Sequence, residues 1–183
     1  MACGAMSPRV AVLAVALALL AVTVGTTAGR QPAAPAPAVS AGVFAELDGR
    51  WAGTGIILGQ PSRVQMEWAA VLDGRFVRLT FVSHIGTGPT GRRFEGHAYY
   101  ERRTDGSIRA TWFDSGGLVR PITAVERPGT LVSAWGTPAT EEGETTYSVT
   151  APGVMQVVDR VKSKDGSWRE FGRSTLSRTL RPE

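Results

Sequence analysis

Aromatic and polar side chains in the middle of this 183-residue chain have the types needed to bind a small molecule. Four aromatic rings could line an apolar pocket, and a buried arginine could pair with the carboxylate of a ligand. Most of them fall on segments with the alternating pattern of β-strands. The ligand-binding residues that we predict are Trp68, Arg78, His97, Tyr99, Trp112 and Tyr147.

Acid–base catalysis would need ionisable side chains that face one cavity within hydrogen-bond reach. His97 with Tyr99 or Glu95 is the pair that could supply it, and Glu67 and Asp159 are the other carboxyl candidates. An isomerase, cyclase or hydrolase acting inside a cavity is therefore the enzymatic alternative. The sequence assigns no catalytic residue, and we expect a binding protein rather than an enzyme.

Metal and nucleotide chemistry find little support in the residues. The two histidines are His84 and His97, and a zinc site usually needs three or four converging ligands at recognisable spacing. The one cysteine, Cys3, precedes the apolar N-terminal run, so a mature chain would have no thiol for a metal, a disulfide or a nucleophile. We predict no metal site, and no glycine-rich phosphate loop precedes a helix.

Short β-type segments separated by turn residues must position these side chains. A helix is expected at 43–47, and three Asp-Gly pairs, at Asp73, Asp105 and Asp165, predict tight hairpins. The connections are too short for crossover helices, so sequential strands should pair antiparallel. The strands that we predict are 50–58, 63–72, 75–84, 92–101, 107–113, 118–124, 130–135, 144–150, 154–162 and 167–179.

About ten sequential strands would leave two exposed sheet edges, and closing the sheet into a barrel removes them. The predicted fold is therefore all-β, an up-and-down antiparallel barrel of about ten strands with a short N-terminal helix. Both faces of segment 92–101 are mixed: Phe94 and Tyr100 alternate with His97 and Tyr99. A barrel that encloses a ligand can carry such polar and aromatic groups inside. The alternative is that the aromatic side chains fill the barrel completely.

The N-terminus has the pattern of a secretory signal peptide. Arg9 precedes an apolar run of about 15 residues, shorter than the roughly 20 needed to span a bilayer, and small residues follow. We predict a signal peptide at 1–28 with cleavage near Ala28, and a Pro/Ala-rich disordered tether at 29–42. The barrel domain would occupy 43–183, and the protein would be exported to the periplasm or the medium.

The charge of the chain does not favour a nucleic-acid partner. The sequence has 20 Lys and Arg against 16 Asp and Glu, a formal net charge of +4, and its basic residues are scattered. A nucleic-acid binder would be expected to concentrate them on one stripe. We therefore expect a small hydrophobic molecule as the partner, no nucleic acid, and no integral membrane segment in the mature chain.

The segment Gly49-Arg-Trp-Ala-Gly-Thr-Gly55 resembles the opening of the calycin group of lipocalin-like barrels, nitrobindins among them. The resemblance implies structural roles for Gly49, Trp51, Gly53 and Gly55, in which a glycine–tryptophan pair closes one barrel end. It also implies that a late arginine packs over the indole ring, and Arg173 and Arg178 are the candidates.

Two further stretches, 72–77 and 110–117, resemble a bacterial lipocalin-like domain family of unknown function, and the resemblance covers most of 44–179. Likeness to nitrobindins implies haem, which these proteins bind through a histidine near the C-terminus. This sequence has no histidine after His97, so the ligand does not carry over. Haem could then be held only by His97 or His84 as a substitute ligand.

Overall fold

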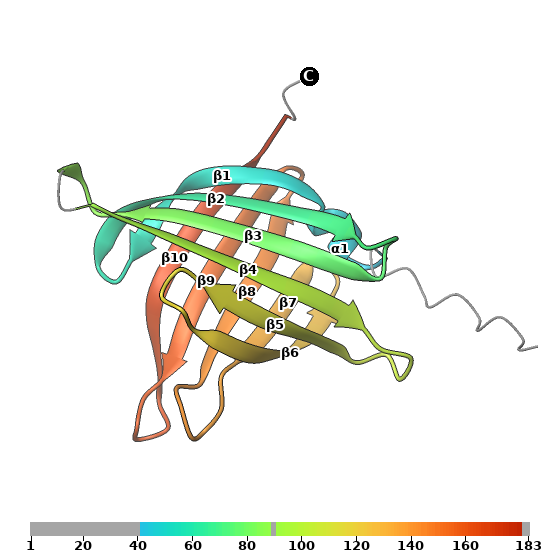
Figure 1. The fold of residues 1–183 in the computed structure, drawn as a ribbon. Helices are drawn as coiled ribbons and strands as arrows, with labels where there is room; N and C mark the ends of the chain where they lie inside the picture. Colours follow the sequence, from blue (N-terminus) through green and yellow to red (C-terminus); the bar gives the residue numbers. More distant parts are fainter. Residues whose placement is uncertain (1–40, 89–90, 181–183) are drawn as a thin grey trace, which may run out of the picture. The chain divides into compact units, whose positions relative to one another are not determined.

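Ten antiparallel strands close into a barrel in the part of the chain that the computed structural model describes, residues 41–88 and 91–180 (Figure 1). Each strand pairs with its neighbours in sequence, and β1 pairs with β10 to complete the ring. The predicted fold is confirmed. The elements are α1 (Val43–Leu47), β1 (Gly49–Ile57), β2 (Gln60–Val71), β3 (Phe76–Ile85), β4 (Arg92–Arg102), β5 (Ile108–Asp114), β6 (Val119–Arg127), β7 (Thr130–Trp135), β8 (Gly143–Ala151), β9 (Val154–Lys162) and β10 (Trp168–Thr179).

The two segments predicted before the barrel fall almost entirely outside the described residues. The predicted signal peptide at 1–28 lies outside them completely, and of the predicted tether only Ala41 and Gly42 are described. Among the residues described, no helix has the length and apolar character needed to cross a membrane.

The three Asp-Gly pairs form hairpin turns, as predicted. Gly74, Gly106 and Gly166 all have positive φ angles, between 74° and 84°, a conformation that glycine adopts without a steric penalty. At the second turn the carboxylate of Asp105 accepts hydrogen bonds from the backbone N–H and hydroxyl of Ser107, at 2.9 and 2.6 Å. These two bonds lower the pKa of Asp105 and fix the turn.

Helix α1 closes one end of the barrel. Its apolar side chains Val43, Phe44 and Leu47 are buried, and the Phe44 ring lies 6.1 Å from Trp68 and 5.5 Å from Tyr100 between centroids. The indole N–H of Trp51 donates to the carbonyl oxygen of Leu47 at 2.7 Å. These contacts position the helix across the ends of β1, β2 and β4.

An arginine from the last strand completes this closed end. The guanidinium of Arg178 lies over the Trp51 ring, 4.4 Å from its centroid, and donates to the carbonyl oxygens of Asp48 and, at 2.6 Å, Glu46. The arginine–tryptophan packing implied by the calycin resemblance is confirmed for Arg178. Arg173 forms a salt bridge with Glu170 instead.

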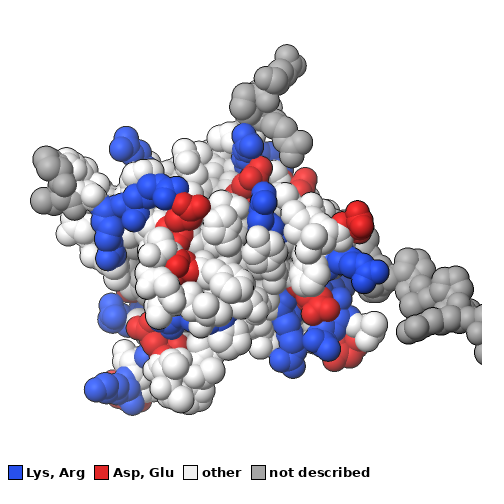
Figure 2. Space-filling view, in the orientation of Figure 1, with Lys and Arg blue, Asp and Glu red and all other residues white. Residues whose placement is uncertain are grey.

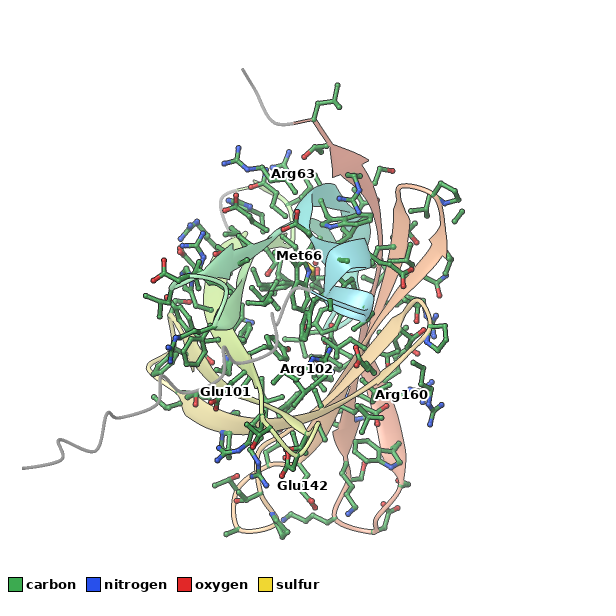
Figure 3. The ribbon with its side chains drawn as sticks, turned by 90° about the vertical axis from the view of Figure 1, so that its right-hand side faces the viewer. Arg63, Met66, Glu101, Arg102, Glu142 and Arg160 are labelled. Atoms are coloured by element: carbon green, nitrogen blue, oxygen red, sulfur yellow. The ribbon has the colours of Figure 1, made fainter. Side chains whose placement is uncertain are left out.

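Side chains alternate between the barrel interior and its outer surface. On β3, Val77 and Leu79 point inward and are buried, while Arg78 points outward. Figure 3 shows the same contrast on β2, where Met66 points into the barrel and Arg63 lies on its outer side. On the face drawn in Figure 2, basic and acidic side chains are interspersed rather than gathered by sign.

Candidate functional site

A cavity of about 280 Å³ lies inside the barrel, on the side away from α1. This volume is close to the lower limit of roughly 300 Å³ for small-molecule sites. The cavity reaches exposed side chains at the far end, among them Leu58, Arg92 and Leu118, so it opens to solvent there. The interior is therefore partly open, and the aromatic side chains do not fill it completely.

Aromatic rings form much of the cavity wall. The Trp112 ring stacks on Phe94 with 6.5 Å between centroids and lies 6.3 Å from Phe81. Gly96, on the neighbouring strand, gives the indole its space, because a Cβ atom there would lie 2.0 Å from the Trp112 ring. A side chain at position 96 would displace the ring, so the glycine and the tryptophan together shape this wall.

A second glycine–tryptophan pair shapes the wall between β7 and β8. Gly143 lies directly opposite Trp135, and a Cβ atom on this glycine would lie 1.9 Å from the indole ring. The Trp135 ring also makes an edge contact with Phe171 of β10, at 6.4 Å between centroids. Trp135 and Phe171 both line the cavity.

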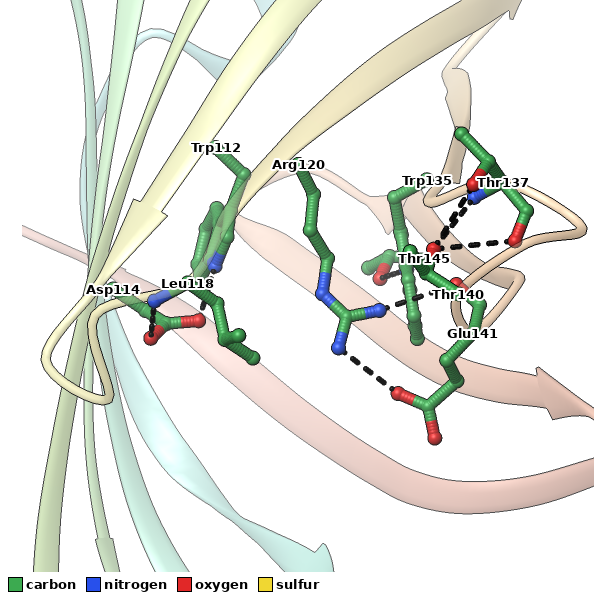
Figure 4. A network of polar contacts seen from close by, with 9 residues as sticks. All are labelled: Trp112, Asp114, Leu118, Arg120, Trp135, Thr137, Thr140, Glu141 and Thr145. Carbon is green, nitrogen blue, oxygen red and sulfur yellow. Dashed lines mark hydrogen bonds and ion pairs between the residues drawn. The ribbon is translucent and has the colours of Figure 1, made fainter.

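Polar contacts fix these tryptophans near the open end (Figure 4). The Trp112 indole N–H donates to Asp114 at 3.0 Å. The guanidinium of Arg120 lies 5.0 Å from the Trp135 ring centroid and pairs with the Glu141 carboxylate at 3.1 Å. The cavity entrance therefore has a polar border in which Asp114 and Arg120 hold defined positions.

Two buried tyrosines form a polar cluster at the cavity's inner end. The hydroxyl groups of Tyr100 and Ser133 are hydrogen bonded at 3.0 Å, and Tyr147 bonds to Tyr100. Burial raises the pKa of Tyr100 to about 12 and that of Tyr147 well above its usual range, so both remain neutral at physiological pH. The hydroxyl of Ser83, also at the cavity, is buried without a hydrogen-bond partner among the described residues.

Asp159 places a carboxyl group in the cavity wall. Its Oδ1 atom accepts a hydrogen bond of 2.7 Å from the Thr145 hydroxyl, which in turn accepts one of 3.2 Å from the indole N–H of Trp135. Burial raises the pKa of Asp159 to about 6, and the nearby charge of Glu170 contributes in the same direction. A pKa near neutrality in a cavity is a frequent property of functional carboxyl groups.

The structure brings together two of the six predicted ligand-binding residues. Trp112 and Tyr147 both line the cavity. Trp68 is buried, but it packs against Phe44 and Tyr100 near the closed end rather than lining the cavity.

The other three predicted residues point outward, so our placement of them in a pocket is corrected. Arg78 forms a salt bridge with Glu67 at 3.5 Å on the outer surface, and His97 contacts Glu95 at 3.1 Å. Tyr99 is 37% exposed. The physical reason is the pleat: on β4 the inward positions are those of Ala98 and Tyr100, which have no exposed surface.

The acid–base pair considered from the sequence lies outside the cavity as well. The hydrogen bond from His97 and the neighbouring Arg93 lower the pKa of Glu95, which keeps that carboxylate ionised. Of the three candidate carboxyl groups, Glu67 and Glu95 lie on the outer surface and Asp159 faces the cavity. Neither His97 nor Glu95 can therefore act on a molecule held inside the barrel.

The cavity residues do not fit haem. His84 is exposed on the outer face of β3, and His97 also points outward, so neither substitute ligand can reach an iron inside. Tyrosine can ligate haem iron, but the raised pKa values of Tyr100 and Tyr147 oppose the phenolate that this requires. Among the described residues, no group of three or more histidine, cysteine or carboxylate side chains could hold a metal ion.

Comparison with solved structures supports the barrel fold. The crystal structure of Rv2717c from M. tuberculosis matches with a TM-score of 0.57 and 15% identity, over 79% of this chain and 99% of that chain. Two designed proteins match less closely. A fluorescence-activating β-barrel designed de novo gives a TM-score of 0.39 at 20% identity, covering 72% of this chain and 93% of its own. The redesigned barrel mFAP0 bound to DFHBI gives a TM-score of 0.40 at 16% identity. That match covers 72% of this chain and 98% of the redesigned one. No family model and no curated protein matches the chain.

Proposed function

We propose that this protein is an exported, non-enzymatic barrel that binds a small, mostly hydrophobic molecule in its cavity. The observation that carries the proposal is the cavity of about 280 Å³, whose lining surface is mostly apolar. Burial of apolar surface would drive binding, at roughly 25 cal/mol for each Å² removed from water. Ser83, the tyrosine cluster and Asp159 would orient the molecule.

Because α1 closes one end of the barrel, a ligand would enter the cavity from the opposite end. The Arg178–Trp51 packing and the buried face of the helix exclude water at that end. A ligand would therefore enter between Leu58, Arg92 and Leu118, at the open end. Its apolar part would pack on Trp112 and Phe81.

A cavity-filling variant with a matched surface control tests this proposal. Ile122 lines the cavity, whereas its neighbour Thr123 is exposed on the outer surface of β6. We expect N-phenyl-1-naphthylamine, an apolar dye that fluoresces on leaving water, to bind wild type and Thr123→Trp. Ile122→Trp should abolish that binding, with folding checked by circular dichroism. Val157→Phe, at another buried position of the cavity wall, is a smaller insertion if Ile122→Trp does not fold. Equal dye binding by all variants would refute cavity binding.

Native mass spectrometry of the exported protein, with an absorbance spectrum, would identify a resident ligand. A bound mass that leaves on denaturation would name its chemical class. The export part of the proposal rests on the pattern of residues 1–28 alone. Secretion should yield a mature chain that begins near Gly29, and full-length protein retained in the cytoplasm would contradict export.

A further inference from the structure

The environment of Asp159 deepens the proposed function, on which the following inference rests, because it restricts the chemistry of the ligand. The surrounding residues define the position of its carboxylate. Gly172 lies directly opposite Asp159 on β10, and a Cβ atom on this glycine would lie 2.7 Å from Oδ2. The glycine thus leaves the space that this oxygen occupies. Oδ1 accepts a hydrogen bond from the Thr145 hydroxyl, which in turn accepts one from the indole N–H of Trp135.

The carboxylate of Asp159 accepts fewer hydrogen bonds than its two oxygen atoms allow. Within residues 41–88 and 91–180, Asp159 accepts a side-chain hydrogen bond from Thr145 and takes part in no salt bridge. An ionised carboxyl group can accept several hydrogen bonds, and a half-buried charge such as that of Asp159 is costly without a partner. A partner from outside the chain that donates hydrogen bonds and carries a positive charge would satisfy it.

The cationic side chains of the cavity do not supply that partner. Arg92 and Arg120 are the basic residues in the cavity lining, and both belong to the open end. Arg120 is already engaged by the carboxylate and backbone carbonyl of Glu141 and by the Trp135 ring. The outward-facing Arg173, from β10, is paired with Glu170.

Aromatic rings complete a site for a cation near this carboxylate. Trp135 and Phe171 are in edge contact with each other, and the Trp135 N–H reaches Asp159 through Thr145. Electron-rich ring faces attract an ammonium group, most strongly where water is excluded. Because Arg120 already lies over the Trp135 ring, Phe171 is the ring that would take this role. The remaining groups that face Asp159 are the neutral Tyr147 from β8 and the negative Glu170 from β10, and neither competes with a bound cation.

From this arrangement we propose that the ligand is a lipophilic amine, whose protonated nitrogen pairs with the carboxylate of Asp159 while its apolar body packs on the aromatic wall. No proton or electron is transferred in this binding step. Oδ2 accepts an N–H hydrogen bond from the ammonium group, and Thr145 continues to donate to Oδ1.

Three probes of one shape test the proposal: 2-naphthylmethylamine, 2-naphthylmethanol and 2-naphthoic acid. Their affinities would be measured by calorimetry near pH 7.5, where the amine is protonated and the acid ionised. A charge-assisted hydrogen bond predicts that wild type binds the amine about 10- to 100-fold more tightly than the alcohol. The acid should bind most weakly.

Asp159→Asn keeps an acceptor for Thr145 but removes the charge, so the preference for the amine over the alcohol should disappear. Glu144→Gln is the matched control, because Glu144 lies on the outer side of β8 next to Thr145 and the substitution also replaces one carboxyl group by an amide. This control should retain the preference. Lowering the pH through about 6 should weaken amine binding in wild type and leave it unchanged in Asp159→Asn.

Equal affinity of wild type for amine and alcohol, or a preference that survives Asp159→Asn, would overturn the inference. If 2-naphthoic acid binds most tightly of the three probes, the inference is also overturned. That result would indicate that Arg92 at the open end binds the ligand. If N-phenyl-1-naphthylamine binds but none of the three probes does, the cavity binds ligands and amine recognition is refuted. If that dye fails as well, the proposed function itself fails.

Discussion

Asp159→Asn should stabilise the protein at neutral pH and leave its stability unchanged at acid pH. The pKa of Asp159 is about 6 in the folded barrel, against 3.8 for an ordinary aspartate. The folded state therefore binds this proton more tightly than the unfolded chain does. The stabilisation that results is full below about pH 4 and is lost as the pH rises through about 6.

The size of the effect follows from the same two pKa values. Each pKa unit corresponds to about 1.36 kcal/mol, so ionised Asp159 lowers the free energy of unfolding by about 3 kcal/mol above about pH 7. Asparagine retains the hydrogen bond with Thr145 and never ionises. Asp159→Asn should therefore gain up to about 3 kcal/mol over wild type near pH 7.5 and close to nothing near pH 4.

Urea unfolding of both proteins at several pH values between about 4 and 8 measures this difference. The pKa values of Glu95, Glu126 and Glu170 are lowered in the folded state, so these residues stabilise the fold at neutral pH and stop doing so as the pH falls. This pH dependence is opposite in sign to that of Asp159. The contributions of Glu95 and Glu126 are common to both proteins and cancel in the difference, whereas that of Glu170 differs through its interaction with the charge of Asp159. Glu144→Gln controls for the loss of one negative charge. If Asp159→Asn is no more stable than wild type near pH 7.5, or the difference is independent of pH, the reasoning about this carboxyl group is wrong.

Three substitutions test the packing around the cavity and the closed end. Gly172→Ala puts a Cβ atom 2.7 Å from Oδ2 of Asp159 and should cost about 1–3 kcal/mol in urea unfolding. Most of that cost should vanish in an Asp159→Ala background, and an undiminished cost there would contradict the proposed clash. Gly96→Ala should displace the Trp112 ring, seen as a changed near-ultraviolet circular dichroism spectrum and a similar loss of stability, and an unchanged spectrum would refute it. Arg178→Ala removes a cation–π contact and two hydrogen bonds and should lower the free energy of unfolding by about 1–3 kcal/mol. Thermal melting would measure this loss, and the exposed Arg63→Ala should lose much less if the packing at Trp51 is the cause.

The strands and turns could be predicted because their signals are local. Asp-Gly pairs fix hairpins through the φ angle of one glycine, as Gly74 and Gly106 show. The predicted strand ends were less accurate: β2 begins at Gln60, whereas we predicted a strand over 63–72. The turn instead uses Leu58 and Gly59, both at positive φ, and such a conformation is rare for leucine.

The inward face of a strand was harder to predict than the alternation itself. On β4 the two sets, Phe94 with Tyr100 and His97 with Tyr99, were separated correctly, but residues from the outer set were also assigned to the pocket. Side-chain hydrophobicity does not identify the inward face of β4, because two of its inward residues, Gly96 and Ala98, are small. The space beside Gly96 is filled by Trp112 from the adjacent strand, and the sequence pattern of β4 alone does not reveal this contact.

Asp159 shows which local signal identifies a polar group inside a barrel. Met155, Val157 and Val161 are buried on alternate positions of β9, so the same periodicity places residue 159 inward. A bulge between Glu170 and Gly172 then brings glycine, rather than a larger side chain, opposite this aspartate, and Phe171 lines the cavity beside it. No pattern in β10 alone predicts that register. A charge that interrupts an apolar alternation, accommodated by a glycine on the partner strand, destabilises the empty barrel at neutral pH. A cationic ligand would offset that cost, and this links the stability prediction for Asp159 to the proposed chemistry of the cavity.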